Sequence, residues 1–152
     1  FTNPRRVKGD LKEALREMDV FIGVSGAGAL KPEWIKAMSP KPIVFALANP
    51  SPEIMPREAT RAGAAVVATG RSDFPNQVNN ALAFPGVFRG AMDAHAVRVT
   101  EGMNIAAALA LAKMVPSPTP RRILPELQNK RVAQNVAAAV KKQALREKVI
   151  RK

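Results

Sequence analysis

The stretch that decides the fold is Val20-Phe21-Ile22-Gly23-Val24, which runs directly into Ser25-Gly26-Ala27-Gly28. A short apolar run that ends in glycines is typical of a buried strand in a parallel sheet. Two similar runs follow at residues 43–48 and 64–68, and each is bounded by Gly or Pro. The sequence therefore predicts three buried parallel strands.

Segments with helical spacing lie between these runs. Apolar residues spaced three or four apart precede the first two runs, and residues 53–62 read as a helix before the third. Alternation of helix and strand predicts an α/β fold with a parallel sheet. The loops that follow the strands should lie at one edge of that sheet, where open parallel sheets bind ligands.

Two further helices are expected in the second half. Thr100 can cap a helix that runs to about residue 114, and because that helix is apolar nearly all round, we expect it to be buried. Prolines at positions 116, 118 and 120 predict a stiff connector, and residues 130–151 predict an amphipathic helix whose apolar seam includes Leu145 and Val149. We therefore assign residues 1–115 to the sheet domain and residues 116–152 to the connector and a helix that packs on it.

Composition limits the class of protein. The chain has 152 residues and no Cys, which excludes disulfides and thiolate chemistry and fits a cytoplasmic location. No apolar run approaches the roughly 20 residues that a membrane span needs, and a start without Met suggests a fragment. Of the net charge of +12, residues 121–152 carry ten Lys and Arg against two Glu, so most of the excess lies near the C-terminus.

The loop at residues 23–28 is the first candidate site. Glycines between a strand and a helix let the backbone approach a phosphate or ribose. The loop departs from the G-x-G-x-x-G pattern, and no acidic residue follows about 20 positions later, so it is not expected to be the main pyrophosphate loop. A purely structural turn is the alternative.

Side-chain amides form the second candidate. Asn49 leaves the second apolar run just before Pro50, where it can bind a ligand or form an Asx turn. Residues 70–80 are dense in Asn and Gln, which favours a polar ligand. His95 reads as a helix residue rather than a base, and Asp73 and Asp93 give weak support for a metal or two-carboxylate site.

Three blocks then make a specific pattern: DVFIGVSGAG at residues 19–28, IVFALANPSPEI at residues 43–54 and ATGRSDFPNQVNNALAFPGVFRGA at residues 68–91. In this order and spacing they resemble the bacterial and archaeal malic enzymes, and the likeness extends over essentially the whole chain. The resemblance implies a partial Rossmann-like NAD(P)-binding domain with flanking helices and a C-terminal amphipathic helix. It also implies an enzyme that oxidatively decarboxylates malate to pyruvate and CO2.

The resemblance carries over to individual residues only where they match. Asn49 matches the Asn of the family's Asn-Pro pair, and Asn79 and Asn80 match its Asn-Asn pair, whose amides contact malate or the nicotinamide end of the cofactor. Val24, Ser25 and Gly26 match a loop that passes along NAD or NADP. The resemblance implies no catalytic residue and no metal ligand within this chain.

The remaining apparatus lies upstream in that family. It comprises the Tyr acid, the Lys base, the acidic ligands of Mg or Mn, and the first Gly-rich turn. The resemblance thus implies that the isolated chain is inactive without a missing N-terminal catalytic segment, and that the complete enzyme is a homo-oligomer, a dimer, with no membrane or specific nucleic-acid partner.

Two other readings stay open on sequence alone. A sequence pI near 11 and a basic tail suggest a nucleic-acid-binding module, although the chain has no Tyr and one Trp to stack on bases. The other is a structural or oligomerisation fragment with an idle binding face, in which uncovered apolar surface would drive self-association.

Overall fold

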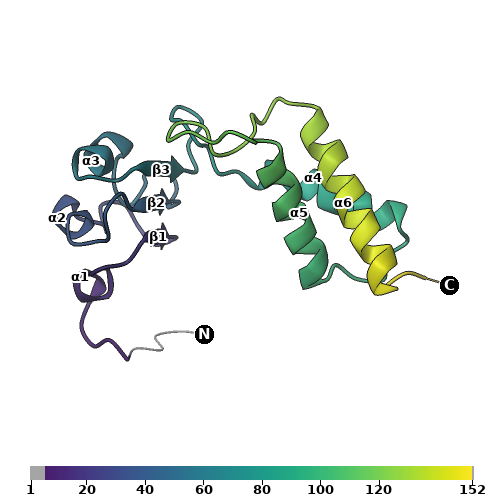
Figure 1. The fold of residues 1–152 in the computed structure, drawn as a ribbon, viewed down its shortest axis with the longest axis horizontal. Helices are drawn as coiled ribbons and strands as arrows, with labels where there is room; N and C mark the ends of the chain where they lie inside the picture. The colour runs from purple at the N-terminus through teal and green to yellow at the C-terminus, as the bar shows by residue number, and fades with distance from the viewer. Residues whose placement is uncertain (1–5, 152) are drawn as a thin grey trace. The chain divides into compact units, whose positions relative to one another are not determined.

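The computed structural model describes residues 6–151, and the chain divides into two compact units at residues 1–78 and 79–152. The first unit holds the sheet with three short helices, and the second is helical (Figure 1).

The sheet of the first unit is parallel and three-stranded. Its strands are β1 (Val20–Gly23), β2 (Ile43–Ala46) and β3 (Val66–Thr69), in the order β1-β2-β3. Their register aligns Val20 with Ile43 and Ile43 with Val66. The predicted α/β class with a Rossmann-like parallel sheet and flanking helices is confirmed, with strands slightly shorter than their apolar runs.

The helices of this unit begin where local chemistry favours it. In α1 (Leu11–Ala14), Asp10 and Glu13 form a reciprocal capping box. Both α2 (Pro32–Ile35) and α3 (Pro56–Arg61) begin with Pro, whose missing N–H costs nothing in the first turn. The helix predicted from residue 53 was therefore wrong at its start, because the residue before a proline is driven into extended backbone.

The core of the first unit lies on one face of the sheet. Phe21 and Val44 pack there with Leu15, Ile35 and other apolar residues of the helices. The expectation of strands buried on both faces was wrong for β1 within this unit. Its side chains alternate, and Val20 and Ile22 on the opposite face are 46% and 65% exposed.

The second unit is built around α6 (Arg131–Glu147), which packs against both α4 (Phe84–Asp93) and α5 (Glu101–Lys113). A 3₁₀ turn, η1 (Asn80–Leu82), precedes α4. As predicted, Thr100 caps α5: its hydroxyl oxygen accepts a hydrogen bond from the N–H of Met103.

Two expectations about these helices were wrong. Ile105 and Leu109 of α5 are more than half exposed, because only one side of that helix packs against its neighbours in this unit. The predicted seam is confirmed at Val132, Val136 and Val140, but Leu145 is 48% exposed. Val149 lies beyond the helix, although it still packs against the same core. A step of four keeps side chains on one helix face, which a step of five does not.

Candidate functional site

Three loops leave the carboxyl ends of the strands: residues 24–31 after β1, 47–55 after β2 and 70–79 after β3. Parallel pairing places these strand ends at the same edge of the sheet. The backbone links the first two loops, since the N–H of Gly28 donates to the carbonyl of Pro52 and that of Leu30 to the carbonyl of Glu53. They are therefore held together by their main chains.

A buried carboxylate strengthens this link. Glu53 is 0% exposed, and its Oε1 accepts hydrogen bonds from the Ser25 N–H at 2.7 Å and the Ser25 hydroxyl at 3.1 Å. Its Oε2 accepts from the N–H of Ala48 at 3.0 Å. One side chain thus holds Ser25 beside the backbone that leads into Asn49. Sequence reasoning missed this residue by placing it in a helix.

The surroundings of Glu53 keep it ionised. Burial by itself would raise the pKa of this carboxyl, but the donors of Ser25 and Ala48 outweigh burial and lower the pKa below its ordinary value.

The missing side chain of Gly23 leaves the space that the Glu53 carboxylate occupies. A Cβ there would lie 2.6 Å from Oε1 of Glu53 and 2.7 Å from the ring of Phe21. A glycine inside a strand was the signal that could have revealed this close approach.

The predicted cofactor residues lie on the open side of the first two loops. Val24 is 80% exposed, and a Cβ added to Gly26 would meet no atom within 4 Å. Asn49 is exposed after the end of β2. Open, glycine-containing backbone at this edge leaves room for a ribose or phosphate.

The amide-rich loop satisfies much of its own backbone. The Asn76 amide donates to the carbonyl of Val67 at 3.0 Å, and that of Gln77 to the carbonyl of Gly70 at 3.4 Å. Asn76 is buried with φ of 58°, a left-handed conformation that Asn tolerates better than most residues. Part of the amide density that favoured a ligand therefore serves the loop itself.

Asn79 and Asn80 differ in their surroundings. The side-chain oxygen of Asn79 accepts a hydrogen bond from the N–H of Ala81 at 2.9 Å and so caps η1, whereas Asn80 is exposed. Both belong to the second unit, while Val24, Ser25, Gly26 and Asn49 belong to the first.

The other candidate groups have local partners. Asp73 forms a two-point ion pair with Arg71, which lowers the pKa of this carboxyl, and Asp93 pairs with Arg89 at 2.8 Å. His95 is exposed and follows α4 in a left-handed conformation, so its prediction as a helix residue was wrong. Within residues 6–151, no group of three acidic, His or Cys side chains is placed to hold a metal ion.

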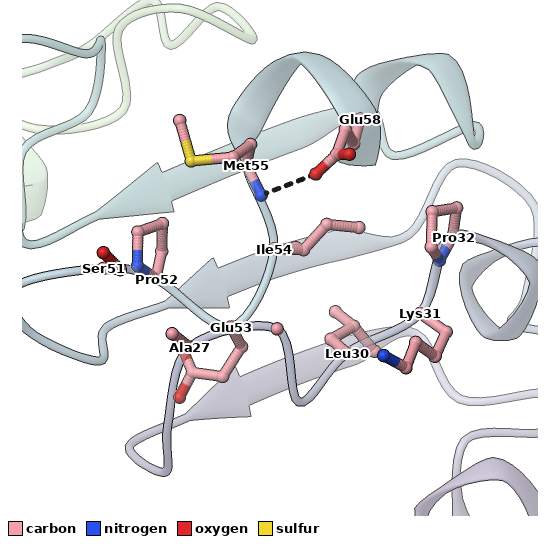
Figure 2. Close-up of a pocket in the computed structure, with 11 residues that line it drawn as sticks. Ala27, Leu30, Lys31, Pro32, Ser51, Pro52, Glu53, Ile54, Met55 and Glu58 are labelled. Carbon is pink, nitrogen blue, oxygen red and sulfur yellow. Dashed lines mark hydrogen bonds between the residues drawn. The ribbon is translucent and has the colours of Figure 1, made fainter.

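A shallow hollow of about 330 Å³ lies between the first two loops and the start of α3 (Figure 2). Glu58, whose carboxylate accepts from the N–H of Met55, borders it. Its other lining residues are Ala27, Gly28, Leu30, Lys31, Pro32, Ser51, Pro52, Glu53, Ile54 and Met55. None of the predicted cofactor residues lines this hollow.

No helix in the described part of the chain is long and apolar enough to cross a bilayer.

Comparison with known proteins places this arrangement in context. The family model described as the malic enzyme NAD-binding domain matches residues 3–145. The bifunctional malic/malolactic enzyme of Bacillus subtilis (strain 168) is 54% identical over 99% of this chain, which covers 37% of that relative. The NAD-dependent malic enzyme of Geobacillus stearothermophilus is 48% identical over 99% of the chain and 32% of its own length.

Solved structures of malic enzymes are also similar to this chain. The crystal structure of malic enzyme from Pyrococcus horikoshii matches 99% of this chain at 49% identity with a TM-score of 0.95, and that of the NAD-dependent malic enzyme from Thermotoga maritima matches 92% at 55% identity with a TM-score of 0.88. The chain covers 35% and 37% of those structures, and so spans about a third of the length of its relatives. With a family model matched along nearly its whole length, this chain belongs to the malic enzyme family, in which it corresponds to part of the NAD(P)-binding domain.

Proposed function

We propose that this chain is the part of a decarboxylating malate dehydrogenase that carries NAD or NADP and helps to orient malate. The complete enzyme would oxidise malate to pyruvate and CO2 as the nicotinamide accepts a hydride. The match to the family's NAD-binding domain over residues 3–145 is the observation that carries this proposal.

In this proposal the cofactor passes along Val24, Ser25 and Gly26. The open backbone at Gly26 and the link from Ser25 to Glu53 support this role, because a loop that is held by hydrogen bonds and has free space beside it can bind an extended ligand at a lower ordering cost. Asn49 would serve both cofactor and substrate.

Asn79 and Asn80 would also help to orient the substrate by offering amide donors and acceptors to a C4 dicarboxylate. The exposed side chain of Asn80 is available for this role. Asn79 uses its oxygen in the η1 cap, so its amide N–H groups would face the ligand.

The acid, the base and the ligands of Mg²⁺ or Mn²⁺ would come from the part of the relatives that this chain does not cover. The described residues do not fit a metal site, so we assign no step through a metal to this chain. By itself the chain would bind weakly and would not turn over malate.

The proposal extends to organisation. Residues 1–115 would belong to the Rossmann-like domain and residues 116–152 to the connector and last helix. The contacts of α6 with α4 and α5, which lie within the second unit, support only the packing of that last helix. The complete enzyme would be a cytoplasmic homodimer. The basic side chains of α6 lie beside its buried seam, as on an ordinary solvated surface helix, and so give little support to a nucleic-acid role.

The test is malate-dependent reduction of NAD and of NADP with Mn²⁺. This chain alone is compared with a hybrid in which it is joined to the part of the Bacillus subtilis relative that it does not cover. We expect activity from the hybrid only, and a loss of roughly 10-fold or more with Asn80→Ala, on the scale of one substrate hydrogen bond. A hybrid that folds but reduces neither cofactor would contradict the proposal, and salt-sensitive DNA binding by the chain would favour the alternative.

A further inference from the structure

Glu53 stands at the junction of the two loops to which the proposed function assigns the cofactor. Its carboxylate receives three hydrogen bonds, two from Ser25 and one from the N–H of Ala48, although Ser25 lies 28 residues away in sequence. Ala48 is the residue before Asn49. A single buried side chain therefore touches both loops at their proposed binding residues.

The chemistry of this junction requires a carboxylate of this length. All three partners are donors, so the site calls for an acceptor-only group, which an ionised Glu supplies. Gln would turn an N–H toward Ser25 or Ala48 and leave a buried donor unpaired. Asp is one methylene shorter and could not hold both partners from the same backbone position.

The main chain shows that the link is built from both directions. The carbonyl of Glu53 accepts from the N–H of Leu30 at 3.1 Å, and Gly23 lacks the Cβ that would displace the carboxylate. Glu53 is thus held by backbone contacts and a fitted space, while its oxygens hold Ser25 and Ala48 in turn.

We propose that Glu53 is a positioning residue, which fixes the Ser25 loop and the backbone at Asn49 in the geometry that receives NAD(P). This inference rests on the proposed function. Glu53 would not touch the reacting atoms; it would act through Ser25 and Asn49, by removing the need to order these loops when the cofactor binds.

The first test uses this chain alone and needs no activity. Hydrogen exchange at single amides is compared between the wild type and Glu53→Gln. We expect the amides of Ser25 and Ala48 to exchange roughly 10-fold faster, because each loses or weakens its acceptor, while the amide of Ile43 stays slow. Unchanged exchange at Ser25 and Ala48 would overturn the inference.

The second test measures the KM for NAD(P) and kcat in the active hybrid. Glu53→Gln should raise the cofactor KM roughly 10-fold, which is the scale of one hydrogen bond left unsatisfied. Leu15→Ala is the matched control, since Leu15 is buried in the apolar core of the same unit and belongs to neither loop. It should lower the unfolding temperature without moving the cofactor KM.

The outcomes separate the two proposals. An inactive wild-type hybrid counts against the proposed function, and hydrogen exchange then decides whether Glu53 holds the loops. An active hybrid in which Glu53→Gln changes KM no more than Leu15→Ala overturns only the positioning role. If Glu53→Gln fails to fold, Ser25→Ala replaces it in the exchange test, because it removes one of the three donors to Glu53 at an exposed position; faster exchange at Ala48 is then the expected result.

Discussion

The hydroxyl of Thr100 donates a hydrogen bond to the carboxylate of Glu147 at 2.5 Å and so joins the start of α5 to the end of α6. The amide of Gln143 donates to the same carboxylate at 2.7 Å. The bonds from Thr100 and Gln143 lower the pKa of Glu147 below its ordinary value of 4.5. Glu147 therefore links the two helices through its carboxylate.

This link predicts a pH dependence of stability. The folded pKa of Glu147 is lowered, so its contribution is present above the unfolded value of 4.5 and is lost as the pH falls through the folded pKa. Urea unfolding between about pH 7 and about pH 3 should show that Glu147→Gln removes part of this acid destabilisation. Glu126→Gln, at an exposed position, is the control and should leave the pH profile as in the wild type.

The close approach of α4 and α6 at Gly90 predicts that a larger residue there destabilises the protein. A Cβ at Gly90 would collide with the carbonyl oxygen of Ala137 and lie 2.8 Å from the Cβ of Val140. Gly90→Ala should therefore lower the free energy of unfolding by about 1–3 kcal/mol, despite the better helix propensity of Ala. Met92→Ala, at a position 72% exposed on the same helix, should change it by less than about 0.5 kcal/mol. Equal stability of the two variants in thermal or urea unfolding would contradict this.

The left-handed backbone at Lys148 predicts that glycine at this position stabilises the protein. It ends α6 with φ of 56° and ψ of 29°, in the left-handed region where a side chain is strained. Lys148→Gly should raise the free energy of unfolding by about 0.5–1 kcal/mol. Lys142→Gly, inside the same helix and equally charged, should lower it by about 1 kcal/mol. If both substitutions destabilise, the strain at Lys148 is not the deciding factor.

Substitutions at Asn79 and Asn80 should distinguish a structural role from a ligand-binding role. Asn79→Ala removes the cap of η1 and should cost about 1 kcal/mol of stability, whereas Asn79→Asp keeps the acceptor and should cost less. Asn80→Ala should leave stability within about 0.5 kcal/mol, because its side chain is exposed. Thermal unfolding of the chain, set beside malate turnover by the hybrid, checks both; a large stability loss in Asn80→Ala would contradict its assignment to the ligand.

Uncovered apolar side chains predict self-association of the isolated chain. Ile22 is 65% exposed on β1, and Phe88 is 59% exposed in an apolar stripe along α4 with Phe84 and Met92. Gel filtration at rising concentration should show oligomers that Ile22→Glu and Phe88→Glu reduce. Lys36→Glu, which adds negative charge at an exposed position that belongs to neither patch, should not reduce them.

Local patterns predicted the elements of the site better than its connections. Short apolar runs that end in Gly or Pro indicated β1 and β2, because such runs need burial and their ends need turn residues. Their position directly after a strand also identified Ser25 and Asn49 as candidate site residues. The role of Glu53 was not predicted, because the residue was placed in a helix and its donor Ser25 is distant in sequence.

By itself, the sequence determined the α/β class, the cap at Thr100 and the family, because periodicity, capping and motif spacing are local properties that need no coordinates. Only the tertiary structure decided which apolar faces are covered, which amides serve their own loop, and where the carboxylates of Glu53 and Glu147 find their donors. These depend on contacts between residues far apart in the chain, and such contacts exist only once the backbone has been arranged in space.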